Sequence, residues 1–439
     1  MRRGWQLAAL GVGVALAIPA RAQQLSRVDR ERAQGMLQVI AADVRKHYYD
    51  PKFHGVDWEA KVHEAHERID KATSLSMAFS HIATALAALD DSHTFFAPPS
   101  RPFRHDYGWR IQMVGDHCYI TEVRPRSDAE AKGLKPGDEI LTINGYVPTR
   151  ENLWKIQYLF NVLRPQPGLR LNLRDLDGRE RQLDMMAQVR QLKRVMDLVG
   201  SGASFDVWEI IREIENQEHL ARARFVELGE ELMILKIPQF VFSEADVNHM
   251  IGKARKRKAL ILDLRGNPGG SVETLKYFLG GIFDHDVKVS DRAGREQKKP
   301  LVAKSKKNDA FAGKLVVLID SESGSAAELF ARVVQLEKRG VVLGARSSGS
   351  VMEARRYSYQ MGIETAIFYG ASITDADLIM TDGKSLEHTG VAPDKTLLPA
   401  ASDLATGSDP VLAHAAELLG VKLNPEQAGK LFPFEWPSL

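Results

Sequence analysis

The alternation of apolar strands with helices in the second half of the chain constrains the fold most. Short runs rich in Val, Ile and Leu recur from residue 232 onward, and helix-length segments separate them. Strands are expected at Leu232–Ile237, Ala259–Leu264, Leu315–Ile319, Val341–Leu343 and Ala366–Thr374, and helices at Ser243–Lys256, Glu273–Phe283 and Ala326–Leu336. This order predicts an α/β core whose largely parallel sheet is covered on both faces.

The N-terminal residues have the composition of a secretory signal. Two arginines precede an apolar run from Leu7 to Ile18, and an Ala-Arg-Ala sequence ends at Ala22. We therefore expect residues 1–22 to be a signal peptide and the mature chain to be secreted, most simply into a periplasm. The apolar run is shorter than the about 20 residues of a membrane anchor. No stable anchor is expected after signal removal.

Charge and cysteine content exclude several classes of protein. Lysine and arginine number 59 against 57 acidic residues, a net charge of +2, which is too balanced for a polyanion binder. Nucleic acid is therefore not an expected partner. Cys118 is the single cysteine, so no intramolecular disulfide can form. The 13 histidines show no metal-ligand spacing, and neither a metal nor another cofactor is expected.

Composition shifts divide the chain into six parts. Few helix breakers interrupt residues 26–88, which predicts helices there. The polar stretch from Asp206 to Leu228, after the β-rich part, also has a helical pattern. The expected parts are the signal peptide (1–22), an N-terminal helical cap (23–100), a small β-rich domain (104–190), a helical connector (191–230), the α/β core (231–399) and a C-terminal tail (400–439), helical near Pro410–Leu419.

The β-rich part resembles a PDZ domain. It contains GLKPGDEILTING, from Gly133 to Gly145, in which Pro-Gly makes a turn and the following Ile and Leu feed a small core. The resemblance implies that the segment before one strand binds the terminal carboxylate of a peptide. The matching residues here are Tyr107, Gly108, Trp109 and Arg110. They depart from the usual loop pattern, so a purely structural PDZ domain is the alternative.

Three remote segments carry side chains suited to chemistry, each with a simpler structural interpretation. The glycines of DLRGNPGG, after the strand that ends at Leu264, could expose backbone N–H groups or form a plain turn. Ser325 stands where a strand turns into a helix, as a nucleophile or as an ordinary N-cap. His93, in DSHT, has the side chain of a general base, although a lone histidine is usually structural.

The order of these motifs resembles the carboxyl-terminal processing and tricorn-core-like serine peptidases. DSHT, the PDZ-like segment, DLRGNPGG, SGSAAE and GKSLEHTGVAPD follow one another between Asp50 and Pro399. The resemblance implies a crotonase-like (ClpP/crotonase) spiral core with a helical cap and an inserted PDZ domain. It also implies protein or peptide substrates and hydrolysis of peptide bonds.

The two branches of that family differ in their base. One branch places a lysine where this chain has Ser350, so a Ser/Lys dyad at this position is excluded. The tricorn-like branch uses a histidine preceded by serine. The resemblance therefore assigns Ser325 as nucleophile and His93 as base, with Glu387 acting through the Ser92 hydroxyl to orient the imidazole.

Further points stay open at this level. The oxyanion hole would consist of the N–H of Ala326 and that of either Gly269 or Gly270. Lys384 is an alternative base. A catalytically inactive peptide- or ligand-binding protein on the same scaffold is the rival function, and the chain could form a homo-oligomer.

Overall fold

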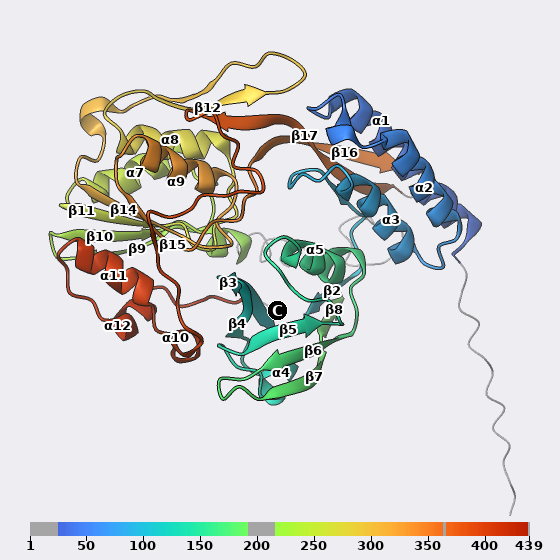
Figure 1. The fold of residues 1–439 in the computed structure, drawn as a ribbon, viewed down its shortest axis with the longest axis horizontal. Helices are drawn as coiled ribbons and strands as arrows, with labels where there is room; N and C mark the ends of the chain where they lie inside the picture. Colours follow the sequence, from blue (N-terminus) through green and yellow to red (C-terminus); the bar gives the residue numbers. More distant parts are fainter. Residues whose placement is uncertain (1–24, 192–215, 363–365, 438–439) are drawn as a thin grey trace, which may run out of the picture.

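A computed structural model of the chain describes residues 25–191, 216–362 and 366–437 (Figure 1). The predicted signal peptide, residues 1–22, lies outside the described residues. Within the described ranges no helix is both long and apolar enough to cross a bilayer.

Three helices form the N-terminal unit, in line with the helical pattern of residues 26–88. They are α1 (Arg27–His47), α2 (Trp58–Asp70) and α3 (Leu75–Ala87), with the short η1 (Phe53–Gly55) between the first two. Each of the three begins at a polar residue whose side chain accepts a backbone N–H, namely Ser26, Asp57 and Ser74. Their apolar faces pack together and against one end of a long strand described below.

The inserted β-rich part is a five-stranded sheet in the order β3-β4-β5-β6-β7, so β3 is an edge strand. The strands are β3 (Trp109–Val114), β4 (His117–Val123), β5 (Glu139–Ile143), β6 (Gly168–Arg174) and β7 (Glu180–Met186), with helices α4 (Asp128–Ala131), α5 (Leu153–Tyr158) and η2 (Leu159–Leu163). The chain enters and leaves through paired strands β2 (Phe103–Asp106) and β8 (Gln188–Gln191). This part has its own apolar core.

The main sheet has six strands in the order β18-β15-β14-β11-β10-β9, all parallel except β9. They are β9 (Arg224–Leu228), β10 (Leu232–Lys236), β11 (Ala259–Asp263), β14 (Lys314–Ile319), β15 (Val341–Gly344) and β18 (Lys395–Thr396). Helices α7 (Glu244–Ala254), α8 (Val272–Ile282) and α9 (Ala326–Leu336) cover one face, and α11 (Pro410–Leu418) with α12 (Pro425–Gly429) covers the other (Figure 1).

Alternation along β10 shows why the sheet is buried on both sides. Met233 and Leu235 pack with α7, α8 and α9, whereas Leu232 and Ile234 pack with α11, and all four side chains are fully buried. The predicted parallel sheet with two covered faces is confirmed.

A second sheet connects the helical unit to the core. It contains β1 (Phe95–Ala97), β12 (Val287–Ala293), β13 (Leu301–Ala303), β16 (Met352–Met361) and β17 (Ile367–Met380). The 14-residue β17 extends well beyond the predicted Ala366–Thr374. Its first half packs on the helical unit and its second half, at Leu378 and Met380, on the main core. One strand therefore ties the two units together.

The helical prediction for Asp206–Leu228 is wrong at its end, and its first part, residues 206–215, lies outside the described residues. Residues 216–221 are helical, but Arg224–Leu228 form β9, antiparallel to β10, and Gly229 makes the turn between them with a φ of 62°. Alternate residues of β9 are half-buried, a period of two that the surrounding Glu and Arg residues masked. β9 thus adds an edge strand to the core sheet, ahead of the predicted boundary at residue 231.

Candidate active site

The turn that carries Ser325 joins β14 to α9. Ser325 has a φ of 50° and a ψ of −115°, a backbone conformation that L residues rarely adopt and that marks strain. Although Ser325 occupies the N-cap position of α9, its side chain makes no cap hydrogen bond. The nearby Ser323 hydroxyl is buried and donates to the carbonyl of Leu264 at 2.8 Å. Of these two serines, only Ser325 is partly exposed and has a hydroxyl without a hydrogen-bond partner among the described residues.

Glu328 stabilises this turn through hydrogen bonds. Its fully buried carboxylate accepts the N–H of Ser325 at 2.9 Å, the Ser347 hydroxyl at 2.6 Å, and the N–H groups of Gly349 and Ser350 at 2.7 and 3.0 Å. Burial raises the pKa of Glu328 to about 7, against the opposing effect of these four donors. Glu328 is the last residue of the SGSAAE motif, but no sequence pattern indicates this role.

His93 is oriented by its neighbour Ser92. The Ser92 Oγ lies 2.7 Å from His93 Nδ1 and donates to Glu387 Oε2 at 2.9 Å. Because the hydroxyl proton is directed to the carboxylate, Ser92 Oγ accepts the Nδ1–H of the imidazole. This leaves Nε2 as the nitrogen that can take up a proton. Burial and Arg356 lower the pKa of His93, although Asp91 raises it, so the neutral ring is favoured at neutral pH.

Glu387 carries further hydrogen bonds. Its Oε1 accepts the N–H of Ser92 at 2.7 Å, and its Oε2 accepts the N–H of Val351 at 2.8 Å. Its side chain is 9% exposed, and burial raises its pKa while these donors lower it. The carboxylate is therefore a junction between the helical unit and the core.

Asp91 shapes the backbone at His93. Its Oδ1 accepts the N–H groups of His93 and Thr94 at 2.9 and 2.7 Å and the hydroxyl of Thr374, on β17, at 2.6 Å. β1, which begins two residues after His93, pairs antiparallel with β17. His93 is thus positioned by the second sheet as well as by Glu387.

The loop at Ser350 and Val351 contacts both the Ser325 turn and Glu387. The carbonyl of Ser350 accepts the N–H of Ser325 at 2.9 Å, and the next residue, Val351, donates to Glu387. Ser350 and Val351 therefore link the Ser325 turn to Glu387, which in turn binds Ser92, whereas no hydrogen bond joins Ser325 to His93 among the described residues. Lys384, the alternative base, has an exposed side chain on the turn after β17.

The backbone donors near Ser325 differ in availability. The N–H of Gly269 donates to Asn267 Oδ1 at 2.8 Å, whereas those of Gly270 and Ala326 have no acceptor among the described residues. A Cβ added to Gly269 would lie 2.7 Å from the Cβ of Ser325, so this glycine permits the close approach of the two turns.

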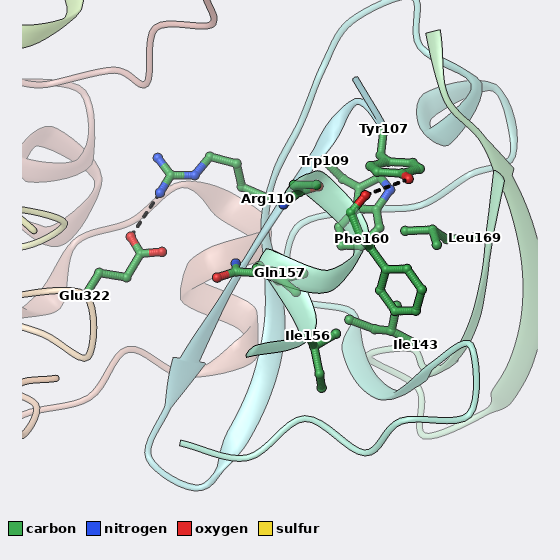
Figure 2. Close-up of a pocket in the computed structure, with 11 residues that line it drawn as sticks. Tyr107, Trp109, Arg110, Ile143, Ile156, Gln157, Phe160, Leu169 and Glu322 are labelled. Atoms are coloured by element: carbon green, nitrogen blue, oxygen red, sulfur yellow. Dashed lines mark hydrogen bonds and ion pairs between the residues drawn. The ribbon is translucent and has the colours of Figure 1, made fainter. Parts of the chain in front are cut away.

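The PDZ-like unit contains a cavity of about 230 Å³ between β3 and α5. Tyr107, Trp109 and Arg110 line it, and Figure 2 shows Arg110 extending from the cavity toward Glu322. The N–H of Gly108 donates to Asp106 at 2.8 Å and is therefore engaged. In contrast, the indole N–H of Trp109 is buried without a partner among the described residues.

The same strand contacts the segment that leads to Ser325. Arg110 pairs with Glu322 at 2.9 Å, Gln112 Nε2 donates to Asp320 at 2.6 Å, and the Ser321 hydroxyl donates to the carbonyl of Met113. The edge strand of the inserted unit therefore rests directly on the turn before Ser325.

Metal-ligand clusters were sought throughout the described part of the chain. No group of three or more His, Cys, Asp or Glu side chains that could hold a metal ion occurs there.

Comparison with known proteins identifies the parts of the chain. Residues 231–397 match peptidase family S41, residues 100–163 the PDZ domain and residues 29–74 the tricorn protease C1 domain. The tail-specific protease of Haemophilus influenzae is 24% identical over 71% of this chain and 44% of its own length. The chloroplastic carboxyl-terminal-processing peptidase 1 of Arabidopsis thaliana is 23% identical over 84% of this chain and 71% of its own.

Two solved structures share the fold. Mature CPAF superposes with a TM-score of 0.64 and 16% identity, covering 86% of this chain and 94% of the other. The photosystem II D1 C-terminal processing protease gives 0.51 and 19%, covering 84% and 93%.

These matches show that the chain is similar to peptidases of family S41 and contains a PDZ domain. Its core, residues 231–397, is a domain of peptidase family S41. The chain spans less than half the length of the Haemophilus relative.

Proposed function

We propose that the chain is an endopeptidase that cleaves peptide bonds through Ser325, His93, Ser92 and Glu387. The observation that carries this proposal is the Ser92 hydroxyl, which accepts from His93 Nδ1 and donates to Glu387 Oε2. This network leaves His93 Nε2 free to act as a base on a hydroxyl, and the strained turn presents that of Ser325.

The proposed reaction has two steps. Ser325 Oγ attacks the scissile carbonyl carbon while His93 Nε2 takes the hydroxyl proton. The imidazolium then gives that proton to the departing amine, and an acyl-enzyme remains. Water, deprotonated by His93, releases the carboxylic acid product and restores Ser325. Glu387 stabilises the transient imidazolium through Ser92.

We assign the oxyanion donors to the N–H groups of Ala326 and Gly270. Ala326 follows Ser325, and Gly270 follows Gly269, which closely approaches Ser325. Neither N–H has an acceptor in the described chain, whereas the N–H of Gly269 donates to Asn267. A donor of this kind stabilises the tetrahedral oxyanion and is worth about 10²–10³ in turnover.

We further propose that the substrates are protein tails and that the PDZ cavity takes the C-terminal end of the tail. The names of the relatives, tail-specific and carboxyl-terminal-processing peptidases, support this substrate class. The unpartnered indole N–H of Trp109 is available to a carboxylate there, whereas the N–H of Gly108 donates to Asp106 and the guanidinium of Arg110 pairs with Glu322. This modifies the expected role of residues 107–110.

The finer features of the chain remain proposals of the same kind. We propose that the core is a crotonase-like spiral, which the repeated parallel strand-and-helix order supports. The N-terminal sequence supports secretion to a periplasm. A homo-oligomer stays a prediction from the family resemblance.

A fluorophosphonate probe tests the central proposal. It should label the intact chain at Ser325, as located by peptide mass mapping, and labelling should vanish in Ser325→Ala. The Ser323→Ala variant should still be labelled, because that hydroxyl is buried in the structure. An intact, folded chain that takes no label would favour the inactive binding protein instead.

A further inference from the structure

The residues after α12 leave the core and reach the PDZ unit. They read Phe-Pro-Phe-Glu-Trp-Pro from Phe432 to Pro437, and Pro437 accepts a hydrogen bond from Arg124, at the end of β4. Helix α10 (Ala401–Thr406), earlier in the same tail, also packs on β4. The C-terminal tail therefore contacts both the core and the PDZ unit.

Every second residue of this segment stacks on an arginine. The guanidinium carbon of Arg224 lies 5.7 Å from the ring centre of Phe432. Arg110 lies 4.9 Å from Phe434, and Arg124 lies 4.5 Å from Trp436. Three successive cation–π contacts at a spacing of two residues require an extended segment, which Pro433 and Pro437 favour.

The residues between the rings make polar contacts to the same surface. Glu435 forms a two-pronged ion pair with Arg222, both distances being 2.8 Å, and lies 3.1 Å from His219. Arg224 donates to the carbonyl of Pro433 at 2.7 Å, and Arg124 to that of Pro437 at 3.0 Å. The arginines thus contact the aromatic rings, the Glu435 carboxylate and the two proline carbonyls of this segment.

The arginines come from two units. Arg222 and Arg224 lie at the start of the core, whereas Arg110 and Arg124 belong to the PDZ unit. Arg110 also pairs with Glu322, three residues before Ser325. The segment thus joins the core, the PDZ unit and the approach to the candidate nucleophile.

We propose that Arg110, Arg124, Arg222 and Arg224 form a second peptide-binding site for extended segments in which aromatic residues flank an acidic one. Residues 432–437 are its intramolecular occupant. Of these four arginines, Arg110 also lines the PDZ cavity. The site selects its ligand by guanidinium stacking and one bidentate carboxylate. Phe432 also packs against the apolar cluster between the main sheet and α11.

A labelled peptide of residues 431–437 tests the site in the full-length chain. The intact chain should bind it weakly, because the tethered segment is present at a high effective concentration. In the triple variant Phe432→Ala, Phe434→Ala, Trp436→Ala the site is vacated, and binding measured by fluorescence anisotropy should tighten by at least about tenfold. Adding Arg222→Gln and Arg124→Gln to this variant should abolish the gain.

Controls separate this proposal from a general loss of structure. A peptide of the same composition in scrambled order should not bind, and Glu426→Ala, an exposed change on α12, should leave binding as in the intact chain. The single variant Trp436→Ala keeps the contacts of Phe432 and Glu435 with the core. It should also bind the peptide more tightly than the intact chain, but by less than the triple variant. Equal binding by intact and variant chains, or binding that ignores the arginine changes, would overturn the site. None of these readouts depends on Ser325 acting as a nucleophile.

Discussion

The two halves of the candidate site are held in opposite ways. Ser325 stands between two consecutive elements of the buried core, and the carboxylate that fastens it, Glu328, is only three residues away. His93 stands on the N-terminal helical unit, and its orienting carboxylate, Glu387, is 295 residues from Ser92. The candidate nucleophile therefore depends on one strand-turn-helix, whereas the candidate base is positioned only when the helical unit and the core pack together through β17.

The largest expected effect lies on the nucleophile side. Ser325→Ala should lower peptide cleavage by on the order of 10⁶-fold, because no other group can form the acyl-enzyme. Its thermal unfolding should remain that of the parent chain, since the side chain makes no cap bond. Ser323→Ala should show the reverse, a loss of about 1–3 kcal/mol in stability from its buried hydrogen bonds with labelling retained. Comparable cleavage by both variants would contradict the assignment.

The next effect lies on the base side. Glu387→Gln should reduce the probe-labelling rate of Ser325 by about 10³–10⁴-fold, because the imidazolium loses its counter-charge. The double variant with Ser92→Ala should cost little more than either single change, since the two residues act as one unit. Glu417→Gln, an exposed glutamate, serves as the matched control. Additive losses would show that Ser92 and Glu387 act separately.

Glu328, which holds the Ser325 turn, should make the free energy of unfolding depend on pH. Its folded pKa of about 7 lies above the ordinary glutamate value of 4.5, so its contribution is full below about pH 4.5 and is lost as pH rises through 7. The shift corresponds to roughly 3 kcal/mol. Chemical denaturation of Glu328→Gln should therefore lack this fall between pH 4.5 and 7. If Glu328→Gln shows the same pH dependence as the parent chain, Glu328 does not titrate between pH 4.5 and 7 in the folded state.

The smallest effect concerns the pKa of His93. Arg356, which is exposed on β16, lowers that pKa, so Arg356→Gln should move the acidic limb of the labelling-rate profile upward by about a few tenths of a pH unit. Lys46→Gln, a change of charge elsewhere on the surface, should leave the limb in place. A downward movement would mean that a group other than His93 sets the limb.

Local patterns explain which elements could be predicted. The strand at 315–319 is a continuous apolar run, and only Asp263 interrupts the one at 259–264. The expected helix at Ala326–Leu336 begins and ends at the residues seen in the structure. Arg224–Leu228 was wrongly predicted as helix, because its strand character comes from pairing with β10 rather than from its own composition. β1 was missed for the same reason, since three residues acquire strand geometry only against β17.

The site divides along the same line. Sequence alone determined that a serine would stand at a strand-to-helix turn and that another strand would end in a glycine-rich turn, because each feature depends on neighbouring residues. Only the tertiary structure decided that Asn267 occupies the N–H of Gly269, that Glu387 reaches Ser92, and that the tail stacks on arginines of two units. Such contacts join residues far apart in the chain, and their partners are chosen by how the units pack rather than by any local preference of the backbone.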